Sequence, residues 1–413
     1  FLDTAYEYEN IIKLGRQLGY KFKGSPTSYG TVALYVTAPA ATAGSGPDPN
    51  YLPILRRGST FSSINGTGYI LNENVNFSSP SNEIVVAAVE PATGIPTSYA
   101  VRAYGQVISG EILEESVVIG PYQRFRRVTV PGSSIAEVLS VVDSEGHKYY
   151  EVEYLSQNTV FVQVDNKGSH TDTVGVLMKP VIVPRRFTLE NSLGGTVLQF
   201  GYGSEENLNS NLIADPSNVV LDIHGKNYIS DLAFDPSKLT QTDKFGVAPA
   251  NTTLTITFRN NRSNRINAAV GALTKVRKRD FIFPAFERGE SLLSSQTQFV
   301  IDSLEVINQD PIIGDIPLPA STELKTRIFG NFATQNRAVT SQDYESLVYT
   351  MPPQFGAIKR VRVVQDKDSF KRNLNMYVIS EDPSGNLAVS NSVIKSNLKS
   401  WITRYKMIND TID

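Results

Sequence analysis

Apolar residues near the start of the chain recur with a helical period. Within residues 3–18, Tyr8, Ile11 and Ile12 lie near one face, and Gly19 follows as a C-cap. The pattern therefore predicts an N-terminal helix.

From residue 32 to about residue 260, short runs alternate between apolar and polar positions, which is typical of strands. Turn signals such as Asn65-Gly66 separate these runs. Pro180 and Pro184 indicate that the last run before residue 184 is interrupted or lies at a sheet edge. The clearest runs are 32–37, 84–89, 99–104, 127–130, 138–142, 149–153, 160–164, 174–183 and 251–258.

The pattern changes after about residue 320. Thr340 can cap a helix whose apolar face continues to Met351, and Pro352-Pro353 then stops it. Residues 357–364 and 375–380 read as strands. A second helix follows, with Ile394, Leu398, Trp401, Ile402 and Tyr405 in one stripe.

Together these elements predict a multi-domain α+β fold with β-rich central modules. We expect an N-terminal helix with a β segment at 1–75, a β-rich inserted domain at 76–190 and a β-rich core domain at 191–319. Residues 320–413 would form an α/β module of helix, strand, strand and helix. We expect this module to be truncated at its C-terminus.

Composition narrows the range of functions. A chain of 413 residues predicts roughly two to four domains. The absence of cysteine excludes disulfides and thiolate metal sites. No apolar run is long enough for a membrane span, so we expect no membrane insertion.

The sequence offers little for catalysis. Its three histidines, His147, His170 and His224, share no short motif and occupy turn-like contexts. The pairs Glu114-Glu115 and Glu205-Glu206 are adjacent, so on a strand their side chains would point to opposite faces. No phosphate loop or serine nucleophile elbow is present. We therefore expect no enzymatic activity, no cofactor and no metal site.

Two basic clusters are candidates for binding an anionic partner: Arg124 with Arg126 and Arg127, and the run 275–279. Acidic residues flank the second cluster, and the formal net charge of the chain is −2. We interpret both clusters as solvated or protein-facing surfaces and expect no nucleic-acid binding.

The segment 336–345 resembles the signature of baseplate J-like proteins, the wedge proteins of contractile phage tails and related injection machines. In that signature an Arg and a Val-Thr precede an Asp-Tyr-Glu that opens a helix, and a proline break and a strand follow. The matching residues are Arg337, Val339, Thr340, Asp343 and Tyr344. Residues 10–20, 55–61 and 200–203 resemble further elements of the family.

The resemblance implies a structural subunit of the virion that is assembled in the host cytoplasm. It would pair with another copy, contact other wedge and hub subunits, and link wedges into a ring that rearranges on contraction. A β-rich receptor- or carbohydrate-binding tail fibre or adhesin is the alternative. The two differ in assembly, because a fibre protein should form a free trimer.

The last helix offers candidate interface residues. We expect its apolar stripe to pack on the module's own strands, because a single amphipathic helix usually faces its own sheet. Lys395, Lys399 and Arg404 on its flank would then be available to acidic groups of a partner.

Overall fold

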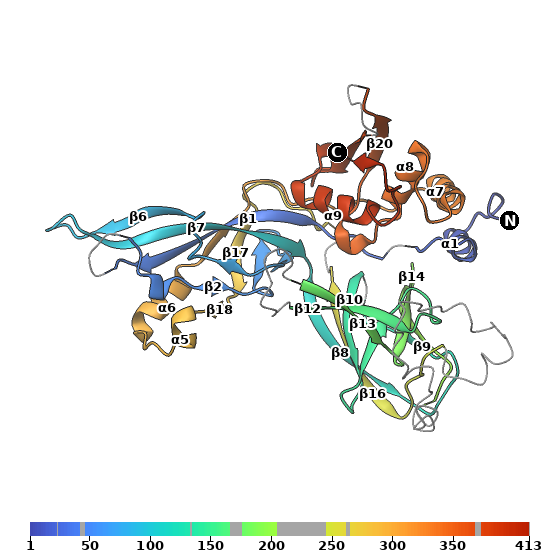
Figure 1. The fold of residues 1–413 in the computed structure, drawn as a ribbon, viewed down its shortest axis with the longest axis horizontal. Coiled ribbons are helices and arrows are strands. Elements are labelled where there is room, and N and C mark those ends of the chain that lie inside the picture. Colours follow the sequence, from blue (N-terminus) through green and yellow to red (C-terminus); the bar gives the residue numbers. More distant parts are fainter. Residues whose placement is uncertain are drawn as a thin grey trace, which may run out of the picture. The chain divides into compact units, whose positions relative to one another are not determined.

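The computed structural model describes residues 1–22, 24–41, 46–132, 134–165, 176–204, 245–261, 265–367 and 373–412. The chain forms two compact units, one from residues 1–111 with 259–413 and the other from residues 112–258 (Figure 1). The fold is strand-rich and α+β with more than one domain, as the sequence predicts. The four-part division at residues 75, 190 and 319 stays a prediction.

The first unit is built on a seven-stranded sheet in the order β17-β3-β4-β7-β1-β19, with β6 also paired to β7. β1 and β7 are antiparallel over eleven residue pairs, from Tyr29↔Ile108 to Pro39↔Ser98. The strands are β1 (Tyr29–Pro39), β3 (Thr60–Ser63), β4 (Gly68–Leu71), β6 (Glu83–Val89), β7 (Pro96–Ser109), β17 (Leu273–Lys278) and β19 (Glu305–Ile307).

One face of this sheet carries the largest core. Val32, Leu34 and Val36 alternate along β1 and are fully buried, as the period-2 pattern predicts. Val300 of α6 (Ser294–Asp302) packs into the same cluster. Smaller elements complete this region: η1 (Pro49–Tyr51), β2 (Ile54–Leu55), β5 (Val75–Asn76), β18 (Phe281–Ile282) and α5 (Pro284–Glu287).

β6 is unlike the other strands of this sheet, because all seven of its residues are exposed. Among the described strands it pairs only with β7, and Figure 1 shows the two strands running together to one end of the unit. Ile84, Val85, Val86 and Val89 are among the exposed large apolar residues. β6 therefore presents an apolar, exposed strand edge.

The C-terminal part of this unit is a small α/β module. Its sheet has the order β20-β21-β22, and β23 also pairs with β21. A second core joins its helices and strands to Tyr29 and Ile313 at the end of the large sheet. The elements are α7 (Ser321–Thr334), α8 (Ser341–Tyr349), η3 (Pro353–Phe355), β20 (Arg360–Gln365), β21 (Asn373–Glu381), β22 (Leu387–Val389), α9 (Ser392–Ile402) and β23 (Thr411–Ile412).

The N-terminal helix α1 (Tyr8–Gln17) is shorter than predicted. Residues before it form a turn, in which the Ala5 amide donates to the Phe1 carbonyl at 3.1 Å. Ile11 and Ile12 are buried in a cluster with Leu324 and Ile328 of α7. The helical face read from the sequence is thus confirmed.

The second unit contains a seven-stranded sheet in the order β8-β16-β10-β11-β14-β15-β9. Its core includes Val141, Leu198, Phe200, Leu254 and Ile256, all fully buried. The strands are β8 (Glu111–Ile119), β9 (Arg127–Thr129), β10 (Ile135–Val142), β11 (Lys148–Glu151), β14 (Arg186–Ser192), β15 (Gly195–Phe200) and β16 (Thr252–Asn260).

A separate two-stranded ribbon pairs β12 (Thr159–Asp165) with β13 (Val176–Ile182). Pro180 lies in β13 opposite Phe161. A strand in a two-stranded ribbon has a free edge, which agrees with the edge position predicted from the prolines. His170, His224 and Glu205-Glu206 lie outside the described residues.

Candidate assembly interface

β21 is paired unevenly on its two sides. On one side it pairs with β20 from Leu374↔Gln365 to Ile379↔Arg360. On the other side β22 pairs only with residues 379–381, and β23 pairs only with residues 373–374. Along residues 375–378, no strand in the described part of the chain pairs with this second side.

The backbone groups that face this open edge follow from the alternation of an antiparallel ladder. The Ile379 carbonyl accepts from the Lys359 amide, and the Asn373 carbonyl accepts from the Asp366 amide, so odd-numbered residues of β21 point toward the β20 side. Even-numbered residues point the other way. The N–H and C=O groups of Met376 and Val378 therefore face the open edge.

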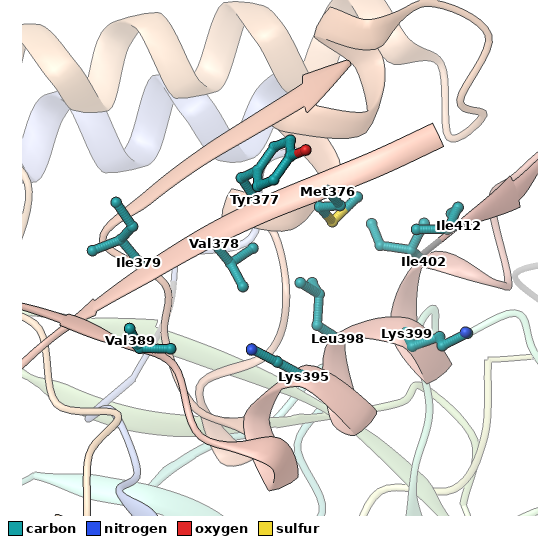
Figure 2. Close-up of a pocket in the computed structure, with 10 residues that line it drawn as sticks. All are labelled: Met376, Tyr377, Val378, Ile379, Val389, Lys395, Leu398, Lys399, Ile402 and Ile412. Atoms are coloured by element: carbon teal, nitrogen blue, oxygen red, sulfur yellow. The ribbon is translucent and has the colours of Figure 1, made fainter. Parts of the chain in front are cut away.

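A groove of about 470 Å³ lies along this edge. Figure 2 shows Met376 and Val378 above Leu398 of α9, with Val389 of β22 at one end and Ile412 of β23 at the other. Tyr377 is 61% exposed and Val389 79% exposed. The groove is thus lined mainly by apolar side chains, and several of them are open to solvent.

Two of the three predicted interface residues border the groove. Lys395 and Lys399 lie one turn apart on α9 and line the groove (Figure 2). Arg404 does not line it; its guanidinium lies 5.8 Å from the centre of the Trp401 ring. Their role as an interface stays a prediction.

α9 is fixed at both ends of its buried stripe. Asn391 caps the helix by accepting from the Ile394 amide at 2.9 Å, and its side-chain amide donates to the Tyr29 carbonyl. Near the other end, the Trp401 indole donates to the Leu347 carbonyl at 3.0 Å. The stripe packs on the module's own strands, as expected.

Comparison with solved structures finds partial likenesses, among them likenesses to chains of two baseplate assemblies. The chain is similar to a chain of the anti-feeding prophage baseplate, with a TM-score of 0.26 and 11% identity, over 98% of this chain and 60% of that chain. It is also similar to a chain of the type VI secretion system TssK-TssF-TssG baseplate subcomplex, with a TM-score of 0.32 and 9% identity, over 98% of this chain and 91% of that chain. The chain thus spans about three-fifths of the first.

The comparisons at the level of sequence found no match. No protein-family model and no curated protein matches the chain.

The residues of the 336–345 motif form the start of α8. Thr340 accepts from the Asp343 amide at 3.2 Å, and the Asp343 carboxylate accepts from the Thr340 amide at 2.8 Å. This reciprocal pair is a capping box, and it confirms Thr340 as the N-cap. The preceding Arg337 and Val339 are exposed.

Tyr344 connects α8 to the chain just before β23. Its buried hydroxyl donates to the Asp410 carboxylate at 2.7 Å. Burial raises the pKa of the Tyr344 phenol, and its hydrogen bond to Asp410 raises that pKa further. Ala338 also forms a parallel bridge with Lys406. The motif therefore holds the segment that leads into β23, which closes one end of the groove.

The basic clusters have acidic or aromatic neighbours. Arg127 pairs with Glu190 at 2.5 Å, and Arg124 stacks over Tyr202. In the second cluster, Arg277 pairs with Glu111 at 2.7 Å, and Arg279 pairs with Asp302 at 2.8 Å. These pairs fit the interpretation of a mixed-charge protein surface.

His147 belongs to a turn, where its Nδ1 lies 3.2 Å from the Asp143 carboxylate. Within the described ranges, no group of three or more His, Asp or Glu side chains is arranged to hold a metal ion. No helix in the part of the chain that the structure describes is long and apolar enough to cross a membrane.

Proposed function

We propose that the chain is a structural subunit of a contractile-tail baseplate, with no chemistry of its own. In the proposed role it is a wedge protein that pairs with another copy, contacts other wedge and hub subunits, and links wedges into a ring in the virion. The ring would rearrange when the tail contracts.

The observation that carries this proposal is the exposed apolar strand β6 in the first unit. β6 exposes Ile84, Val85 and Val86, and β7 is the one strand in the described part of the chain that pairs with it. Proteins usually protect such edges, because they add further strands readily. An exposed apolar edge strand of this kind suits a subunit whose edge is covered in an assembly.

The 336–345 motif supports the baseplate assignment through its resemblance to baseplate J-like proteins. Its Thr340, Asp343 and Tyr344 each make the contacts that order α8 and the chain before β23. The motif therefore orders the C-terminal module, which carries the candidate interface residues Lys395 and Lys399.

Incorporation into particles tests the proposal. A tagged chain should co-purify with tail baseplates, and the triple variant Lys395→Glu, Lys399→Glu, Arg404→Glu should stay folded while its incorporation drops. The physical reason is that reversing three exposed charges repels the acidic groups expected on a partner.

A matched variant carries the same charge change at exposed Lys13, Lys148 and Lys179, none of which lines the groove, and should incorporate normally. Recovery of the tagged chain as a free trimer, absent from baseplates, would contradict the wedge role and favour a fibre or adhesin.

A further inference from the structure

The hydrogen bonds of β7 show which residues of β6 face outward. The Ser109 amide donates to the Ser28 carbonyl on the β1 side, and the Gln106 carbonyl accepts from the Asn72 amide on the opposite side. Bonding directions alternate along an antiparallel strand. Odd-numbered residues of β7 therefore bond toward β1, and even-numbered residues bond toward the side on which β6 lies.

This alternation determines the outer edge of β6. Glu83 and Val85 lie opposite even-numbered residues of β7, so their N–H and C=O groups bond to β7. The N–H and C=O groups of Ile84 and Val86 therefore point to the open edge. The register shifts between Val86 and Ala88, and this irregularity ends the regular part of the edge.

The regular part of this edge has little protection against pairing. Natural edge strands are commonly blunted by charged side chains, by proline or by a bulge. Residues 84–89 read Ile-Val-Val-Ala-Ala-Val, with neither charge nor proline. The register shift lies beyond Val86, so it shortens the edge without covering its two outward-facing residues. The edge can therefore accept a short strand at Ile84 and Val86.

The side chains of β6 restrict the occupant, because they are apolar on both faces of the sheet. Ile84 lies opposite the buried Val101, on the face that carries the largest core, and Val86 shares that face. Val85 points to the other face and is 63% exposed. Strands that are buried on both faces read as continuous apolar runs. The occupant should therefore also present apolar side chains on both of its faces.

A second copy of β6 meets this requirement. In an antiparallel pair related by a two-fold axis, Ile84 of each copy can lie opposite Val86 of the other, with Val85 beside its counterpart. This register joins outward-facing backbone groups to each other. A slip by two residues in one direction would place Ile84 opposite Ala88, beyond the register shift. A slip in the other direction would place Val86 opposite Asn82, before β6 begins.

Charge also favours self-pairing over an acidic or basic partner segment. Glu83 is the one charged residue in the sequence of β6, and its carboxylate is paired with Arg102 at 2.5 Å. In the two-fold register, Glu83 would lie opposite Ala87 of the other copy, so no like charges would meet. A partner segment rich in one sign of charge would gain little attraction along this strand.

We propose that β6 pairs with β6 of a second copy, antiparallel about a two-fold axis at Val85, so that the large sheets of the two copies become continuous. This deepens the proposed function, because it names the strand through which one copy pairs with another. The contact is short, whereas a standard interface uses about 20–30 residues on each side. We therefore expect a weak dimer in dilute solution, which forms more fully where copies are held together.

A charge exchange at the two-fold axis tests the proposal. Val85→Lys or Val85→Glu would bring like charges together across the axis, so each variant alone should dimerise about tenfold more weakly than the natural chain. An equal mixture of the two variants should recover pairing, because the introduced ammonium then meets the introduced carboxylate. Sedimentation equilibrium over a range of chain concentrations measures the dimer fraction.

A matched pair of variants controls for the added charge. Val118 of β8 is an exposed valine on another strand, so Val118→Lys and Val118→Glu should dimerise like the natural chain. Amide hydrogen exchange locates the contact, since exchange at Ile84 and Val86 should slow as the concentration of the natural chain rises. An unchanged melting temperature shows that each variant is folded.

Four results would overturn the proposal. The first is a natural chain that stays monomeric up to about 1 mM. The second is undiminished pairing in both Val85 variants, which would place the contact elsewhere. The third is a mixture of these variants that pairs no better than each alone. The fourth is slow exchange at Ile84 and Val86 at every concentration, which would show that the same polypeptide covers the edge. All four are measured on the purified chain without baseplates, so the two proposals fail separately.

Discussion

At the scale of single residues, the sequence predicts contacts between residues that lie close together along the chain. Thr340 and Asp343 are three residues apart, so their capping contacts depend on one turn of chain and could be read directly. The hydrogen bond from Tyr344 to Asp410 joins residues that are 66 positions apart, and no local sequence pattern predicts it. The helical pattern predicts that Lys395 and Lys399 lie on the flank of the last helix, but the groove that they border depends on β21 and β22 and cannot be predicted from the helix alone.

The capping box gives the first prediction at this scale. Thr340→Ala should lower the free energy of unfolding of the first unit by about 1 kcal/mol, because the Asp343 amide loses its acceptor. Chemical denaturation measures the change. Ser341→Ala at the next, exposed position is the matched control and should have little effect. Equal losses in both variants would place the start of α8 elsewhere.

At the scale of elements, the alternation of apolar residues predicts β21 and its neighbour β20, but not the short strands β22 and β23 on the other side of β21. The predicted strand at 375–380 corresponds to β21, Asn373–Glu381, since its alternating apolar residues face the module's core. The open edge depends on where the short β22 and β23 pair, and each contributes only two or three residues. Strands this short leave too weak a periodic signal for their register to be read.

A close approach between elements gives the second prediction. Gly314 has φ +138°, and a Cβ added there would lie 2.4 Å from the Thr27 carbonyl oxygen. Because the neighbouring atom belongs to the backbone, it cannot move aside easily. Gly314→Ala should therefore cost about 3 kcal/mol, from backbone strain plus overpacking.

Gly271 provides the control for strain alone. It has φ +70° with no atom within 4 Å of an added Cβ, so Gly271→Ala should cost only about 1 kcal/mol. Thermal and chemical denaturation of both variants measure the difference. If the two substitutions cost the same, the approach of Gly314 to Thr27 does not limit the packing where β1 begins.

At the scale of the whole molecule, one unit interrupts the other in sequence. Residues 112–258 are inserted between Glu111 and Arg259, and each unit has its own buried clusters. The two points at which the insert joins the first unit lie close together, because the Arg259 guanidinium donates to the Ser109 carbonyl at 2.6 Å. The sequence showed strand-like runs on both sides of these points, with no change of pattern to mark them.

Excision of the insert gives the third prediction. Joining Glu111 to Arg259 through Gly-Ser-Gly should leave the first unit folded. Its free energy of unfolding should change by about 1 kcal/mol or less, because Ser109 and Arg259 are already in contact and the folded insert, like the short linker, is not a long flexible loop. Calorimetry should find one cooperative transition. A shortened chain that binds a hydrophobic dye and unfolds without a transition would show that the first unit needs the insert.

The same interruption affects how the protein emerges from the ribosome. β3 ends at Ser63, but its partner β17 begins at Leu273, so more than two hundred residues are translated before that ladder can close. At about 5–20 residues per second, the nascent chain spends about ten seconds or more with β3 exposed on that side. The inserted unit has its own core and can fold during this interval. During this interval the unpaired edge of β3 is at risk of aggregation. The risk ends only when β17, which follows the insert, has been synthesised and pairs with β3.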